Sequence, residues 1–152
     1  MTDPITFASA TPRFALPFLF SGQAQKEFFV NQAHALADLL LHPAVKGTAT
    51  TPPASPADGD CWLIGATPTG DWAGHANHLV ARQAGSWLFA SPRNGMVVFD
   101  EQRGQFIRFT DSWQVAAIVA APTGGTVIDV QARAAIAGLL AAITKAGIIP
   151  AA

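Results

Sequence analysis

Two apolar runs separated by a polar turn occupy the stretch Met96-Val97-Val98-Phe99-Asp100-Glu101-Gln102-Arg103-Gly104-Gln105-Phe106-Ile107-Arg108-Phe109. β-Branched and aromatic residues on both sides of a short turn predict a β-hairpin. Gly104 can supply the positive φ angle of such a turn, because glycine has no Cβ to clash with the backbone. The stretch therefore places an antiparallel sheet in the middle of the chain.

Further strand-like segments lie on both sides of this hairpin, separated by Gly, Pro, Asp and Asn. With the two runs of the hairpin they are Cys61–Ile64, His78–Gln83, Trp87–Ala90, Gly95–Asp100, Gln105–Thr110 and Trp113–Ala117. We expect residues 59–117 to form a small antiparallel β-sheet or barrel. With a helix on each side, the predicted fold class is α+β, mainly β.

The N-terminal part is predicted to be an apolar arm followed by a helix. Three prolines in residues 1–20 favour an extended arm, and its apolar side chains favour docking on another surface; the docking candidates are Phe14, Phe18, Leu19 and Phe20. Ser21 is the expected N-cap of a helix over residues 21–42. Helical spacing predicts one buried stripe on it, consisting of Phe29, Ala33, Leu36 and Leu40. Residues 43–58, rich in Thr and Pro, are expected to be a linker without regular structure.

The C-terminal part is predicted to be a Gly/Pro linker over 118–126 and a helix within 127–149. Asp129 is the expected N-cap, and Gly147 is the expected C′ residue after the last turn. The helix is apolar on nearly every side, which is typical of a buried helix, and a sheet of about sixty residues offers it little cover. Heptad spacing predicts an oligomer interface, with a trimer favoured and a pentamer as the alternative. Its residues are Ala132, Ile136, Leu139, Leu140 and Ile143.

The overall composition favours an assembling protein over several other classes. Half of the 152 residues are hydrophobic and 12% are charged, against roughly 25% charged in ordinary soluble domains. The net charge of -1 provides no basic surface for nucleic acid. The longest apolar run is much shorter than the roughly 18 residues that a membrane span needs. We therefore expect neither nucleic acid nor membrane as a partner.

No known catalytic motif occurs, so an enzyme is not expected. His75 and His78 lie in a Gly-rich loop without a second ligand cluster, and Cys61 has the surroundings of a small core residue. The adjacent acids Asp58 with Asp60, and Asp100 with Glu101, lie where turns and strand ends use carboxylates. We predict no catalytic residues, no metal and no cofactor.

The four tryptophans offer a second possible chemistry, because flat aromatic faces can bind sugar rings. Trp62, Trp87 and Trp113 begin strands among apolar neighbours, which favours packing in the core. Trp72 lies in a Gly-rich loop. It is therefore the candidate for an exposed glycan contact.

Three segments together resemble a bacteriophage-related family whose domain has no assigned function. They are Leu16-Pro17-Phe18-Leu19-Phe20-Ser21-Gly22-Gln23-Ala24-Gln25-Lys26-Glu27, residues 52–60 with Trp72-Ala73-Gly74-His75, and the helix that begins near Val127. The resemblance implies occurrence in phages, prophages and gene transfer agents, where one member is assigned to the head spikes. It carries no catalytic residues over to this chain.

The sequence therefore leads to a virion structural protein: a head spike, fibre base or decoration protein of a phage or gene-transfer-agent particle. We expect synthesis in the cytoplasm and assembly into the particle, with copies of the chain and capsid or other particle proteins as partners. The alternative is a carbohydrate-binding module that recognises a host surface polysaccharide.

Overall fold

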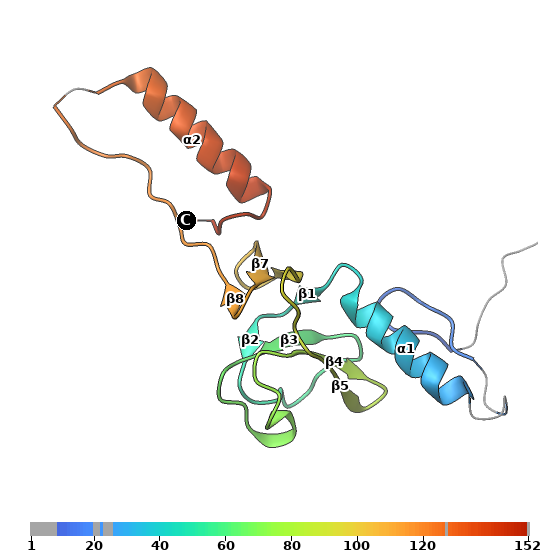
Figure 1. Cartoon of the computed structure of the whole chain (residues 1–152). Coiled ribbons are helices and arrows are strands. Elements are labelled where there is room, and N and C mark those ends of the chain that lie inside the picture. The colour runs from blue at the N-terminus through green and yellow to red at the C-terminus, as the bar shows by residue number, and fades with distance from the viewer. Residues whose placement is uncertain (1–8, 20–21, 23–25, 127, 152) are drawn as a thin grey trace, which may run out of the picture. The chain divides into compact units, whose positions relative to one another are not determined.

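The computed structural model describes residues 9–19, 22, 26–126 and 128–151. These residues form two compact units. The first unit comprises the chain up to Pro43 together with Thr48–Pro92, and the second comprises Ala44–Gly47 together with the chain from Arg93 onward. Within the described residues each unit contains one α-helix and one four-stranded sheet (Figure 1). The fold is α+β and mainly β, as predicted, and neither sheet closes into a barrel.

The sheet of the first unit has the strand order β2-β3-β4-β5. Its strands are β2 (Thr48–Ala49), β3 (Cys61–Ile64), β4 (Leu79–Gln83) and β5 (Ser86–Ala90). β2 runs parallel to β3, and the other pairs are antiparallel. The β4–β5 turn consists of Ala84 and Gly85, both at positive φ, which is the geometry of a tight two-residue hairpin.

The sheet of the second unit has the order β1-β6-β7-β8. Its strands are β1 (Ala44–Val45), β6 (Val97–Asp100), β7 (Gln105–Phe109) and β8 (Trp113–Gln114). β6 and β7 pair in antiparallel register, with Phe99 opposite Phe106, and Gly104 in their turn has a φ of 66°. The hairpin predicted from the sequence is confirmed.

The predicted linker 43–58 is partly wrong, because it contains β1 and β2. Each strand has two residues and runs parallel to a longer strand, β1 to β6 and β2 to β3. So short a strand has no periodicity that a sequence pattern could reveal. A two-residue strand is recognised only by the backbone hydrogen bonds that it forms with the longer strand beside it.

Helix α1 (Lys26–Leu40) buries a different face from the one predicted. Its buried residues are Ala35, Asp38 and Leu39, whereas Phe29 of the predicted stripe is 72% exposed. Gly22 lies within the predicted helix span of 21–42, but its φ of 101° is not helical, and the helix begins only at Lys26. The expected N-cap, Ser21, lies outside the described residues.

The buried carboxylate of Asp38 explains why α1 buries the face that contains Ala35, Asp38 and Leu39. Asp38 accepts hydrogen bonds from the Thr11 hydroxyl (2.6 Å), the Arg13 amide (3.1 Å) and the Phe14 amide (2.7 Å). Asp38 and Thr11 are each 3% exposed. Hydrogen bonds to an ionised acceptor are stronger than neutral ones and offset the cost of burying it.

The side chain of Arg13 closes the C-terminal end of α1. Its guanidinium donates to the carbonyls of Asp38 (2.6 Å), Leu39 (3.0 Å) and His42 (2.9 Å). The last carbonyls of a helix have no partner within the helix and carry partial negative charge, so a cation there is favourable.

The described part of the arm is folded, so the prediction of an extended arm is wrong for residues 9–19. Ala10 forms an antiparallel bridge with Pro17, and the Phe18 amide donates to the Ser9 carbonyl at 3.0 Å. The contacts to Asp38 and the helix end hold this loop on α1.

Replacing Asp38 with Ala should detach the loop from α1. Thr11 and two backbone amides would lose their acceptor, and unpaired buried donors cost about 1–3 kcal/mol each. We expect the free energy of unfolding to fall by about 2–4 kcal/mol, measured by urea denaturation with tryptophan fluorescence. Asp58→Ala, at an exposed position, is the control. Equal effects of the two substitutions would contradict the role of Asp38.

Candidate functional site

Helix α2 (Val130–Lys145) begins and ends as the sequence predicts. The Asp129 side chain accepts a hydrogen bond from the Ala132 amide at 2.9 Å. After the helix, the amides of Gly147 and Ile148 donate to the carbonyls of Thr144 and Ile143 at 2.9 and 3.0 Å. This pair of bonds, with Gly147 at a φ of 70°, is the Schellman arrangement that ends many helices.

The end of α2 is fixed to the sheet of its own unit. The Phe106 amide donates to the Gly147 carbonyl at 2.6 Å. A Cβ added to Gly147 would lie 3.2 Å from Cδ2 of Phe106 and 3.4 Å from Cε2 of Phe99. The next residue but one, Ile149, is buried. The rings and the glycine thus pack too closely for a larger residue.

No residue of α2 is buried. Of the predicted interface, Leu139 is 66% and Ile136 is 41% exposed, Ala132 is exposed, and Leu140 and Ile143 are half-buried. The helical repeat brings all of them except Leu140 to one stripe, because residues three and four apart share a face. We call this set, Ala132, Ile136, Leu139 and Ile143, the outer stripe.

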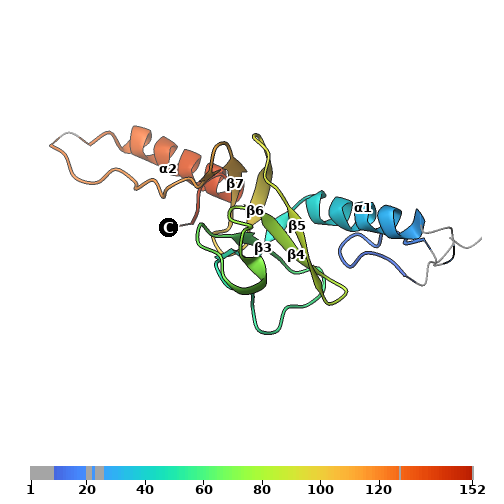
Figure 2. The same cartoon turned by 60° about the horizontal axis from the view of Figure 1, so that its bottom comes forward.

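Leu140 lies on a second face of α2, which borders a groove of ≈ 380 Å³. Figures 1 and 2 show residues 118–126 leading away from the sheet and α2 returning toward it. The groove is lined by Ile118, Val119, Ala120, Ala121, Ala137, Leu140, Ala141, Thr144, Ile149 and Pro150. None of these residues is charged. The sequence analysis missed this groove, because it assigned 118–121 to a linker.

The first unit contains a second groove, of ≈ 560 Å³, between α1 and the β4–β5 hairpin. Its lining combines aromatic with polar side chains: Phe18, Glu27, Phe28, Asn31, Gln32, Ala35, Gln83, Ala84, Ser86, Trp87 and Leu88. The sequence analysis did not identify it. The spacing of Phe28, Asn31, Gln32 and Ala35 along one helix face is the signal that could have indicated it.

The expectation that Trp72 is exposed is wrong. Trp72 is 0% exposed, because the short 3-10 helix Gly70–Trp72 carries its ring onto the sheet. The ring centroid lies 6.2 Å from that of Trp62 and 5.2 Å from that of Trp87. Trp72 belongs to the core of the first unit, with Ile64 and Val80, and presents no face to a sugar.

The two loop histidines have structural contacts. The His75 ring stacks on Phe89 at 3.9 Å between centroids. The His78 ring nitrogens lie 3.0 Å from the Ala76 carbonyl and 3.0 Å from the Ser91 hydroxyl. Among the residues that the structure describes, no group of three or more His, Cys, Asp or Glu side chains could hold a metal ion.

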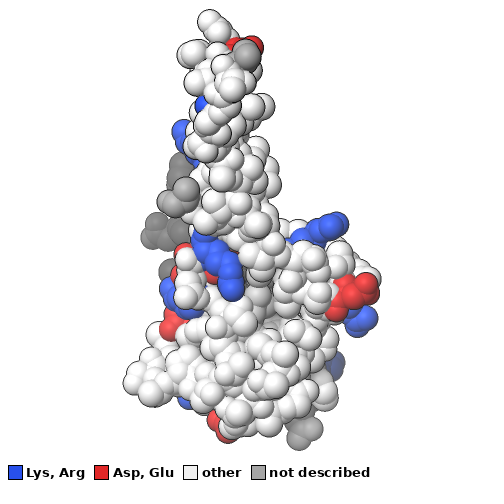
Figure 3. Space-filling model, turned by 90° about the vertical axis from the view of Figure 1, so that its left-hand side faces the viewer, with Lys and Arg blue, Asp and Glu red and all other residues white. Residues whose placement is uncertain are grey.

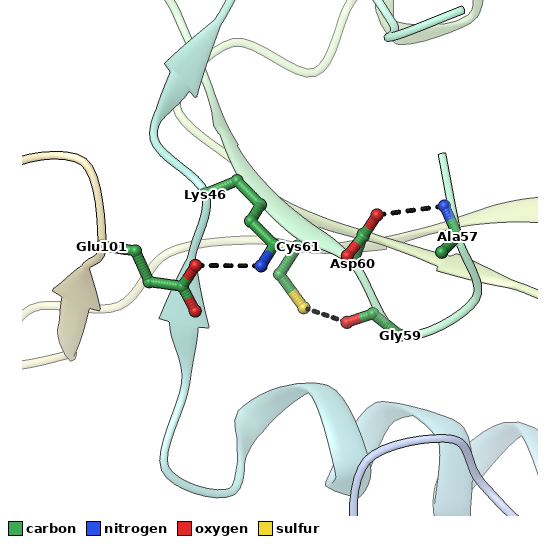
Figure 4. A network of polar contacts seen from close by, with 6 residues as sticks. All are labelled: Lys46, Ala57, Gly59, Asp60, Cys61 and Glu101. Carbon is green, nitrogen blue, oxygen red and sulfur yellow. Dashed lines mark hydrogen bonds and ion pairs between the residues drawn. The ribbon is translucent and has the colours of Figure 1, made fainter. Parts of the chain in front are cut away.

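Asp60, Glu101 and Cys61 each have a polar partner (Figure 4). In the first unit Asp60 accepts from the Ala57 amide at 3.0 Å, and the buried Cys61 thiol donates to the Gly59 carbonyl at 3.3 Å. In the second unit Glu101 pairs with Lys46 at 3.0 Å. Such contacts serve turns and strand ends.

Asp100 is fully buried at the start of the β6–β7 turn. Its carboxylate pairs with the Arg103 guanidinium and accepts from the Arg103 amide at 3.0 Å. Both contacts close the turn locally, so this acid stabilises the hairpin.

Residues 30–114 match a family described as proteins of unknown function, DUF2793. Since the match covers more than half of the chain, the chain belongs to this family. A search of curated proteins and of solved structures found no match. The matched range contains all eight strands described above and ends before α2. Neither helix in the described part of the chain is long and apolar enough to cross a membrane.

Replacing Gly147 with Ala should loosen α2 from its sheet. Gly104 has nearly the same φ, 66° against 70°, but a Cβ there meets nothing within 4 Å. Gly104→Ala therefore measures the backbone strain alone, about 1 kcal/mol. We expect Gly147→Ala to cost about 1–3 kcal/mol more in chemical denaturation. Equal costs would show that the contact with Phe106 is unimportant.

Proposed function

We propose that the chain is a non-enzymatic structural component of a phage or gene-transfer-agent particle, a head spike, fibre base or decoration protein. In this proposal copies of the chain associate through α2. The observation that carries it is the exposure of α2: the helix has 16 residues, none of them is buried, and two of them, Arg133 and Lys145, are charged.

Burial of the outer stripe supplies the free energy for association. A large aliphatic side chain that leaves water contributes about 1.5–3 kcal/mol, and Ile136, Leu139 and Ile143 recur in every copy. No charged residue belongs to the outer stripe, so identical stripes do not repel one another. Figure 3 shows mostly uncharged atoms over the part of the molecule that contains α2.

The assignment to a particle is supported by the resemblance of three segments to a bacteriophage-related family: residues 16–27, residues 52–60 with 72–75, and the C-terminal helix. In the proposal the N-terminal loop is the docking site on the particle. Phe14 is 42% and Leu19 is 36% exposed, and Phe18 is half-buried. Phe20 lies outside the described residues. Several weak apolar contacts, repeated in each copy, hold an oligomer through effective concentration.

A lysine in the outer stripe should abolish association. Leu139→Lys places a charge where another helix would pack, and an unpaired buried charge is costly. Gly138→Lys is the matched control, because it adds the same charge one residue away, where nothing lies within 4 Å. Light scattering should give the mass of one chain for Leu139→Lys and an oligomer for Gly138→Lys. Mass spectrometry should find the unaltered chain in purified particles.

Two results would contradict this proposal. An unaltered chain that is a monomer at every concentration would remove the self-association. A chain that is absent from purified particles would remove the particle role.

A carbohydrate-binding module is the second candidate, and the groove of the first unit favours it. Phe28 offers an exposed flat ring, while Asn31, Gln32 and Gln83 offer amide groups. Aromatic faces with a few polar groups are typical of small-molecule sites, and both suit sugar rings and their hydroxyl groups.

Phe28→Ala should remove binding to an array of bacterial capsular polysaccharides. Phe29→Ala is the matched control, since Phe29 is similarly exposed but does not line the groove. Equal binding by both variants, or no binding by the unaltered chain, would contradict the glycan role.

A further inference from the structure

The outer stripe and the uncharged groove beside α2 lie on different faces of the same helix. A helix turns about 100° per residue, so the outer stripe and the groove residues Ala137, Leu140, Ala141 and Thr144 are separated by about 120° around the axis. One face carries protruding side chains, with Leu139 66% exposed. The other borders a hollow of ≈ 380 Å³.

We propose that the outer stripe of one copy packs into the groove of the next copy. The occupant of the groove is thus a second copy of this chain, with Leu139 as the central side chain inserted. The inference rests on self-association through α2 and adds which two surfaces meet. Contacts between two different surfaces of identical chains are head-to-tail, in contrast to one stripe that packs against itself.

The positions along the helix support this pairing. The outer stripe extends from Ala132 to Ile143, and the helical lining of the groove from Ala137 to Thr144. The centres of Ile136, Leu139 and Ile143 and of the groove residues differ by about one residue, or about 1.5 Å of rise. In a ring of parallel helices, equivalent residues of all copies lie at one level. The three large side chains of the stripe therefore meet the groove of a parallel neighbour with almost no shift along the axis. Such head-to-tail contacts close as a ring when the rotation between copies permits it.

The chemistry of the two surfaces also agrees. The lining of the groove is apolar apart from Thr144, with no charged side chain, and the outer stripe is wholly apolar. The charged residue near the start of the helix on the side of the preceding loop, Arg133, is engaged elsewhere, because its guanidinium donates to the carbonyls of Pro122 and Gly124. These bonds also hold the chain before α2 close to the helix. They thereby keep residues 118–121, which line the groove opposite the helix, in place.

Complementation between two defective variants tests this pairing. Leu139→Lys removes the inserted side chain and leaves the groove intact. Ala141→Lys places a charge in the groove and leaves the outer stripe intact; Ala141 is exposed, so the lysine does not disturb the fold. Ala137→Lys, at a second exposed groove position, repeats the test, and circular dichroism checks the helix content of each variant.

Each variant alone should be a monomer at concentrations where the unaltered chain assembles. The protein concentration at which half of the chains are assembled should be higher than for the unaltered chain by roughly tenfold or more. Their equimolar mixture should form a pair with twice the chain mass of 15.8 kDa, because one intact stripe then meets one intact groove. The pair cannot grow, since its other two surfaces carry lysine.

Three results would overturn the pairing. Ala141→Lys and Ala137→Lys variants that assemble like the unaltered chain would show that the stripe packs against itself, and the proposed self-association would stand. A mixture that remains monomeric would also overturn the pairing. An unaltered chain that is monomeric would overturn both proposals.

Discussion

Helix α2 exposes more apolar surface than a helix in water normally tolerates. None of its residues is buried, while caps at both ends and the bond from Phe106 to Gly147 hold it as an ordered helix. Exposed apolar stripes of this kind mark interaction surfaces. The low share of charged residues, 12%, agrees with the proposed association, because a surface that other chains cover would need few charges. Association of copies is therefore the central element of the proposed function.

The fold of the first unit depends on a different feature, the buried carboxylate of Asp38. Asp38 binds the loop that contains Thr11, and Arg13 of the same loop closes the end of α1. These bonds give the N-terminal loop a fixed place while Phe14 and Leu19 remain partly exposed. A loop fixed in this way loses little conformational entropy on docking, so its apolar side chains would contribute more of their burial energy to binding.

Patterns with a period could be predicted from the sequence, and contacts between distant segments could not. The β6–β7 hairpin follows from two runs of β-branched and aromatic residues around a turn that contains Gly104, and the ends of α2 follow from Asp129 and Gly147. The buried face of α1 was mispredicted, because Asp38 is polar by composition and only its partners in residues 11–14 explain its burial. Trp72 was mispredicted for the same reason. The outer stripe was found by its heptad spacing, but the groove beside Leu140 was not, since Ile118–Ala121 has no period.

Amide hydrogen exchange of the full chain over a series of protein concentrations tests the central claim most directly. If copies associate through α2, exchange in Val130–Lys145 should slow as the concentration rises, because a covered and packed helix opens less often. The strands β3 and β4, which are buried in the single chain, should exchange at rates that do not depend on concentration. Exchange of α2 that stays fast and independent of concentration would contradict the account.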